Sequence, residues 1–172
     1  MATNTPNLVL RKPDPADLVN VQTDLNGNWD KLDAAAGSWT AYAPVWGGTG
    51  VAIGNGSITG RYLKAGKTVD LHVFLQLGTT STVGTGNWSL SLPAGVIGKV
   101  GVDVFLAAGM TYKAATGLFP ITVELLTGGS TFRLLAVVNA ASSNLGFVQW
   151  NNPGGAWASG DYIRVSARFE IN

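Results

Sequence analysis

Residues 67–77 read KTVDLHVFLQL, and apolar side chains occupy every second position from Val69 to Leu77. Between them lie Asp70, His72, Phe74 and Gln76, so the segment has one apolar face and one largely polar face. Successive side chains of a β-strand point to opposite faces of a sheet, so this period of two predicts a half-buried strand. Residues 161–171, DYIRVSARFEI, repeat the pattern and predict a second strand of the same kind.

Working outward from these two segments, shorter alternating runs appear at 57–63, 88–92, 100–107, 121–126 and 131–139. Turn-forming residues separate them at 65–66, 128–129 and 152–155. Many half-buried strands with glycine-rich turns, and no second helical pattern, are typical of an antiparallel β-sandwich or jelly roll. We therefore expect a mainly β head domain over residues 38–172.

The first residues have a different character. Residues 1–13 contain Pro6 and Pro13, which disfavour helix on their N-terminal sides, so we expect an extended arm. Such a short segment has no core of its own and is expected to lie on another protein, as an attachment arm. The candidate contact residues of this arm are Leu8, Val9, Leu10 and Arg11.

Residues 14–37 predict a single amphipathic helix. Asp14 is a suitable cap, Pro15 suits the first helical position, and Gly37 is a suitable stop. Apolar residues recur at spacings of three or four and form a seam: Leu18, Val21, Leu25, Trp29 and Leu32. Such a stripe needs a partner. Two possibilities stay open, self-association as a short coiled coil and packing on the head or on another protein.

Composition excludes several classes of function. Charged residues make up only 12% of the 172 residues, about half the usual share, and the formal net charge is +1. Low charge favours a protein whose surface is covered by partners, and it disfavours nucleic-acid binding. The chain has no Cys, no predicted signal peptide and no apolar run long enough to span a membrane.

Few residues offer catalytic chemistry. The predicted head has five acidic residues, and Asp70 with His72 forms the one acid–imidazole pair at close spacing. These two side chains share the polar face of one strand, and we interpret them as solvated residues on an outer or inter-subunit face. The glycine-rich stretches 47–50 and 54–56 lack the Lys-Ser/Thr ending of a phosphate loop and are interpreted as turns. We therefore predict no enzyme activity, no cofactor and no metal site.

Tryptophans are the more informative residues. Trp39 and Trp88 are expected in the core, the latter because it alternates with Leu90 and Leu92. Another three, Trp46, Trp150 and Trp157, lie in or beside loops rich in Gly, Asn and Pro. On such loops aromatic rings stack on sugars or anchor a protein partner. The alternative is that they plug the end of the sandwich or a subunit interface.

Several short motifs, in this order, resemble a known class of proteins. They are LRKPDPAD at 10–17, DLN at 24–26, WDKLD at 29–33, WTAY at 39–42, GRY at 60–62, GKTV at 66–69 and SLPA at 91–94. Their order is similar to that in small tail, fibre and virion-surface proteins of phages that infect Gram-positive, especially actinobacterial, hosts. The resemblance covers most of residues 10–95.

That resemblance implies a homotrimeric virion component, bound to other virion proteins through its N-terminal region and exposing a β head. A minor tail, tail-tip or short fibre protein is the leading interpretation, with host cell-wall glycan as a possible ligand. The alternatives are a capsid decoration or head-fibre protein and, behind these, a carbohydrate-binding module. No receptor-binding residue carries over, because the loops of such heads vary.

Overall fold

The computed structural model describes residues 3–5, 9–16, 18–101, 104–139, 144–149 and 153–172. It divides into two compact units, Met1–Ser38 with Lys64–Gly66 and Trp39–Leu63 with Lys67–Asn172. We refer to them as the N-terminal unit and the β head, and describe each by itself.

Ten strands of the described chain build the β head. They are β3 (Thr40–Tyr42), β4 (Trp46–Ala52), β5 (Ser57–Ala65), β6 (Thr68–Gln76), β7 (Thr82–Ser91), β8 (Val104–Lys113), β9 (Gly117–Leu125), β10 (Thr131–Asn139), β11 (Asn144–Phe147) and β12 (Tyr162–Glu170). Their order in the sheet is β3-β5-β6-β12-β8-β9-β10-β7-β4, with β11 paired to β10. The recorded strand pairs are antiparallel. The prediction of a mainly antiparallel β head is confirmed.

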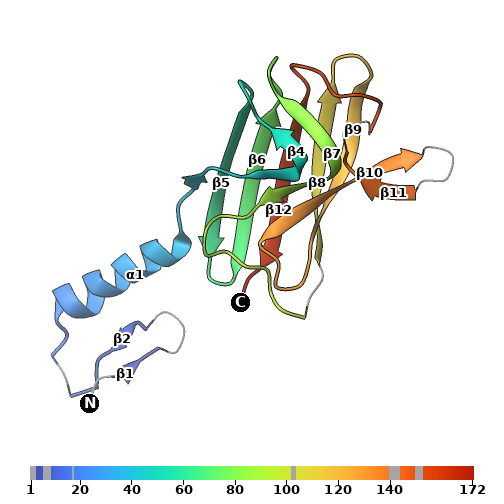
Figure 1. Ribbon diagram of the computed structural model, residues 1–172. Coiled ribbons are helices and arrows are strands. Elements are labelled where there is room, and N and C mark those ends of the chain that lie inside the picture. The colour runs from blue at the N-terminus through green and yellow to red at the C-terminus, as the bar shows by residue number, and fades with distance from the viewer. Residues whose placement is uncertain (1–2, 6–8, 17, 102–103, 140–143, 150–152) are drawn as a thin grey trace. The chain divides into compact units, whose positions relative to one another are not determined.

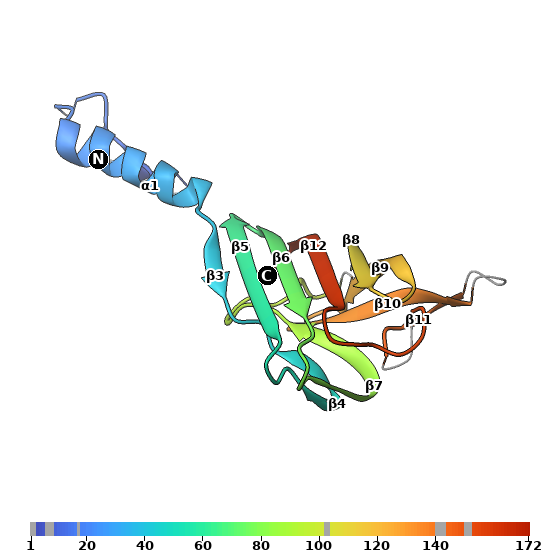
Figure 2. The ribbon, with the colours of Figure 1, turned by 90° about the horizontal axis from the view of Figure 1, so that it is seen from above.

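This sheet curls over its own core. Figures 1 and 2 show β5, β6, β12, β8 and β9 side by side, with β10, β7 and β4 crossing over one face of them. Phe132 on β10 packs edge-on against Phe169 on β12, with ring centroids 5.4 Å apart, although three strand steps separate β10 from β12 in the sheet. The curl therefore gives the head a two-layered, sandwich-like core made from one continuous sheet.

The alternation in β6 and β12 accounts for that core. Val69, Leu71, Val73 and Leu75 are each 3% exposed or less, and their neighbours in sequence are half-buried on the other face. Along β12 the same pattern buries Ile163, Val165, Ala167 and Phe169. The nine-residue register that joins the two strands, from Tyr162 opposite Gln76 to Glu170 opposite Thr68, brings these apolar rows together.

The start of the sheet is held to its far side by Tyr42. Its hydroxyl donates a hydrogen bond to the carbonyl of Ser91 on β7 at 3.3 Å. Next to it, Val45 and Ser91 exchange two further bonds, in which the amide of Val45 donates to Ser91 Oγ and the amide of Ser91 to the Val45 carbonyl. Burial raises the pKa of the Tyr42 hydroxyl above its ordinary value.

The N-terminal unit contains a helix that begins later than predicted. A π-helical turn at Val21–Asn26 leads into α1 (Gly27–Ala36), and Gly37 follows with a positive φ of 75°. Asn20 is the cap, because its side chain accepts bonds from the amides of Gln22 and Thr23. Asp14 accepts from the amide of Ala16, within a turn that precedes the helix. The prediction of a helix from residue 14 is therefore wrong in its start, and Leu18 lies outside the helix.

Over the part that the structure describes, the predicted arm folds back on itself. Strands β1 (Thr3–Asn4) and β2 (Arg11–Lys12) pair as a small antiparallel hairpin. Arg11 binds the helix of its own chain: its guanidinium lies 2.9 Å from the carboxylate of Asp24, and its backbone exchanges two hydrogen bonds with the Asn28 side chain. Asp24 is 2% exposed, so Arg11 forms its ion pair with a buried carboxylate. The same carboxylate accepts a hydrogen bond from the Asn20 amide.

The apolar seam lies on the surface of the described chain. Leu18, Val21, Leu25, Trp29 and Leu32 are all exposed, from 97% at Leu18 to 38% at Leu32. The described helices include none with the length and apolar character needed to cross a membrane.

Candidate functional site

A groove of about 690 Å³ lies on the outer face of the β head, the face turned away from the core. Small residues on the outward face form part of its lining: Ala41 on β3, Ala108 on β8 and Ser166 on β12. Longer side chains line it: Arg61, His72, Phe74 and Arg164. Because the small residues leave the backbone uncovered between the long ones, the sheet surface is hollowed there.

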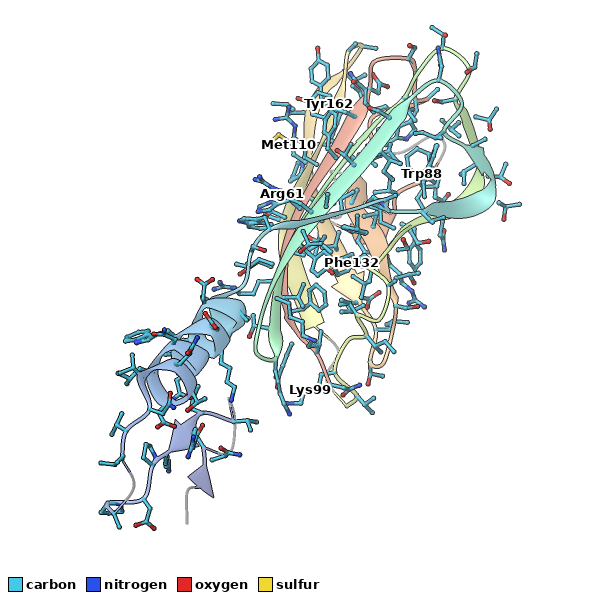
Figure 3. All side chains as sticks on the ribbon, turned by 90° about the vertical axis from the view of Figure 1, so that its left-hand side faces the viewer. Arg61, Trp88, Lys99, Met110, Phe132 and Tyr162 are labelled. Carbon is cyan, nitrogen blue, oxygen red and sulfur yellow. The ribbon has the colours of Figure 1, made fainter. Side chains whose placement is uncertain are left out.

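Strand alternation explains which side chains reach this groove. On β6 and β12 the residues between the buried valines and leucines point outward, so Phe74 and Arg164 face the groove while Val73 and Val165 face the core. Figure 3 shows Arg61, Met110 and Tyr162 along one side of the strands, and Trp88 and Phe132 on the other side. The groove and the core are thus the two faces of the same strands.

Arg61 and His72 line one half of the groove, and Trp39 lies against both of them. The ring centroids of Trp39 and His72 are 4.9 Å apart, and the guanidinium carbon of Arg61 lies 4.8 Å from the centre of the Trp39 ring. Trp39 is 43% exposed. The expectation that Trp39 belongs to the core is therefore wrong: it precedes Ala41 by two residues and shares its outward face, while Tyr42 turns inward.

A second aromatic group flanks the other half. Arg164 lies between Phe74 and Met110 in the register of β6, β12 and β8. Its guanidinium carbon is 5.4 Å from the ring centre of Phe74 and 4.8 Å from that of Tyr162. Tyr112, opposite Tyr162 on β8, stacks on it with centroids 5.1 Å apart. The aromatic surface thus continues across three strands.

The groove carries positive charge that the described residues do not neutralise. Among the ion pairs and side-chain hydrogen bonds of the described chain, none involves the guanidinium of Arg61 or that of Arg164. Both arginines are exposed. Their contacts are with aromatic rings, which orient a guanidinium plane and leave its in-plane N–H groups free to donate.

Asp70 and His72 do not form a dyad in the structure. The carboxylate of Asp70 accepts two hydrogen bonds from Arg168, at 2.7 and 2.8 Å, while the ring of His72 packs on Trp39. These bonds from Arg168 hold the pKa of Asp70 below its ordinary value, against the opposing effect of burial. The interpretation of the pair as residues of an outer face agrees with this placement.

The loop tryptophans lie elsewhere. Trp46 and Trp157 are each 8% exposed and pack on Trp88, with ring centroids 4.7 and 4.8 Å apart. This placement corresponds to the alternative that they plug the end of the sandwich, and it leaves little ring surface for a glycan. Trp150, like Leu8 of the predicted arm, lies outside the described residues.

Beside Trp157 lies a buried cation that sequence reasoning missed. Lys113 is 1% exposed, donates to the carbonyls of Pro153 (2.9 Å) and Gly155, and its ammonium lies 4.5 Å from the Trp157 ring centre. Burial lowers the pKa of Lys113, and the nearby carboxylate of Asp161 acts in the opposite direction. This lysine ties a loop to the end of β8 and has a structural role.

Comparison with known proteins gives one informative likeness. No protein-family model matches the sequence, and no curated protein matches it. Among solved structures, the chain is similar to the crystal structure of the Dettilon tailspike protein, with a TM-score of 0.52 and 14% sequence identity. The likeness covers 79% of this chain and 24% of the tailspike chain, so the chain spans about a quarter of that protein's length. At this identity it shows a shared fold.

Proposed function

We propose that the chain is a structural protein of a phage tail, such as a tail-tip or short fibre component, that exposes the β head for binding to the host surface. The observation that carries this proposal is the fold shared with a tailspike over 79% of the chain. The sequence resemblance to small phage tail and fibre proteins supports it independently and adds Gram-positive, especially actinobacterial, hosts. A capsid decoration protein is the alternative.

A homotrimer is part of the proposal. The support is the exposed seam at Val21, Leu25, Trp29 and Leu32, together with the low share of charged residues, 12%. Large apolar side chains that share one stripe of a helix mark a contact surface, because water disfavours leaving them uncovered. In this arrangement the N-terminal unit assembles the trimer and attaches it to other virion proteins, and the virion is the location of the protein.

The proposed function is binding without catalysis. Support comes from the acidic residues described in the head. Three of them, Asp70, Glu124 and Glu170, are in ion pairs with Arg168, Arg133 and Lys99. The fourth, Asp161, is buried and accepts from two backbone amides. Hydrolysis of a glycosidic bond typically requires two carboxyl groups about 5–10 Å apart across the scissile bond. Asp103 lies outside the described residues.

Electron microscopy of virions labelled with an antibody against the β head tests the location. Label at the distal end of the tail is expected. Label on the capsid would instead identify a decoration protein, and virions without label would contradict the proposal as a whole.

Light scattering on the full chain tests the trimer. A mass three times that of the 17.9 kDa chain is expected, and a stable monomer at micromolar concentration would contradict it. Leu25→Asp is expected to weaken the trimer, because association would bury a carboxylate without a partner. Leu118→Asp is the matched control: it makes the same change at an exposed leucine of the head, 57% exposed, and is expected to leave the mass unchanged.

A further inference from the structure

We propose that the outer groove of the β head binds an anionic saccharide, with Arg61 and Arg164 pairing with its carboxylate or phosphate groups. Trp39, Phe74 and Tyr162 stack on its sugar rings. This inference rests on the proposed function, since it names the ligand class that the exposed head recognises. It places the binding site on the outer face of the sheet, whereas the sequence had pointed to the loop tryptophans.

The two guanidinium groups carry the argument. Each is exposed, and neither pairs with a described carboxylate. Each lies over an aromatic ring, with the guanidinium carbon 4.8 Å from the ring centre. A stacked guanidinium has lost much of its freedom before the ligand arrives, so less side-chain entropy is lost on binding. Its free N–H donors lie in one plane and match the two oxygens of a carboxylate or phosphate. The groove thus presents two oriented anion-binding groups.

The charge of the head favours an external anion over a second copy of this face. A second head would have to supply carboxylates to Arg61 and Arg164. The acidic side chains described in the head already have partners: Asp70, Glu124, Glu170 and Asp161. Packing two such faces together would bring like charges into contact and desolvate arginines without compensation. The anion is therefore supplied by the ligand.

The shape and lining favour a saccharide among anions. A volume of about 690 Å³ lies in the range of small-molecule sites, roughly 300–1,000 Å³, and far exceeds what a free phosphate fills. The lining combines the flat rings of Phe74 and His72 with the polar side chains of Thr59, Ser166 and the two arginines. Sugar rings have C–H faces that pack on aromatic surfaces and hydroxyl edges that bind polar groups. Two further rings lie beside lining residues, Trp39 against Arg61 and Tyr162 against Arg164, and they suit a chain of sugars that extends past the groove.

Calorimetric titration of the full chain with three defined oligosaccharides tests the proposal. An oligogalacturonate supplies carboxylates, an oligomer of glycerol phosphate bearing sugar substituents supplies phosphates, and a neutral malto-oligosaccharide is the control. Binding of at least one anionic probe, weakened by added salt, is expected. Which probe binds distinguishes the carboxylate from the phosphate source. Failure of both anionic probes, or equal binding of the neutral one, would overturn the proposal.

Arg61→Gln and Arg164→Gln are each expected to reduce affinity for the anionic probe by about tenfold or more, because each removes a charge-assisted pair. The matched control is the double variant Asp70→Asn/Arg168→Gln, which removes an ion pair from β6 and β12 on the same outer face without changing net charge. It is expected to bind as the wild type does. Equal losses in the control and the arginine variants would overturn the assignment of the groove.

Light scattering and circular dichroism on the same variants complete the test. Unchanged mass and spectra are expected, since both arginines lie on the outer face and away from the core. A loss of oligomeric mass in Arg61→Gln or Arg164→Gln would identify the groove as a contact between copies, and so overturn it as a glycan site. The location of the protein on the virion is tested separately by antibody labelling, so failure of glycan binding leaves the tail assignment standing.

Discussion

The two faces of the β6–β12 strand pair have the same backbone and opposite roles. On the inner face, Val73 and Val165 join a core in which most side chains are less than 5% exposed. On the outer face, the residues that alternate with the buried ones along each strand place arginines beside aromatic rings around a groove. Burial of apolar area stabilises the first face, whereas on the second face Arg164 pairs with no described carboxylate and the exposed Asp70–Arg168 pair contributes little to stability. Stability and recognition are therefore expected to separate cleanly by face.

The largest loss of stability is expected from a substitution that disrupts packing on the inner face. Phe132→Ala removes a fully buried ring that packs edge-on against Phe169 and is expected to lower the free energy of unfolding by about 3–5 kcal/mol. Phe74→Ala makes the same change on the outer face and is expected to cost about 1 kcal/mol, from its contacts with Tyr162 and Arg164. Urea unfolding followed by circular dichroism measures both. Similar losses for the two variants would show that the faces do not differ as argued.

The next largest loss of stability is expected at Lys113, a buried charged residue on the inner side. Lys113→Met keeps most of the side-chain volume but leaves the carbonyls of Pro153 and Gly155 without their ammonium donor. We expect a loss of about 1–3 kcal/mol in the free energy of unfolding, because the buried carbonyl of Pro153 is left unpaired. The same unfolding experiment measures it, with Lys99→Met, at a half-exposed lysine paired with Glu170, as the control. A variant as stable as the wild type would indicate that water replaces the ammonium.

Tyr42→Phe tests the bond that holds the two sides of the curl. It removes one hydrogen bond to Ser91 and is expected to cost about 1 kcal/mol. Burial raises the folded-state pKa of Tyr42, so its contribution to stability is fully present below the pKa of the unfolded chain and is lost as pH rises above it. The stability difference between variant and wild type is therefore expected to shrink above about pH 10. Unfolding curves at pH 7 and pH 10.5 measure this, and a constant difference would contradict it.

The inner face was largely predictable from sequence, because one apolar residue in two defines it locally. The alternation in 67–77 and 161–171 correctly placed the buried rows of β6 and β12. The groove was not predictable, since Arg61 and Arg164 are about a hundred residues apart and meet only through the order of β5, β6 and β12. In the sequence, the groove is marked only by one arginine in each of two alternating strands. An arginine in such a position is equally typical of an ordinary solvated face.

The tryptophans and the helix start show a second limit. Proximity to Gly and Pro suggested exposure for Trp46 and Trp157, but contacts with Trp88 bury both. At the helix, Asp14-Pro15 gives a strong local start signal, yet the helix begins after Asn20. There the carboxylate of Asp24 pairs with Arg11, thirteen residues away, and a long-range contact of this kind is not visible in local propensities.

The smallest expected effect is at Asp70, which lies on the outer face but outside the groove. Asp70→Asn removes the charge that accepts two bonds from Arg168, and an exposed ion pair of this kind contributes little to stability. We expect a loss well below that of Tyr42→Phe at pH 7. Since Arg168 depresses the folded-state pKa of Asp70, the contribution is present above the pKa of the unfolded chain and disappears as pH falls through the folded value. Unfolding at pH 7 and pH 2.5 measures the change. A large loss at pH 7 would mean that Asp70 supports the fold as an inner-face residue does, and the separation by face would fail on β6 itself.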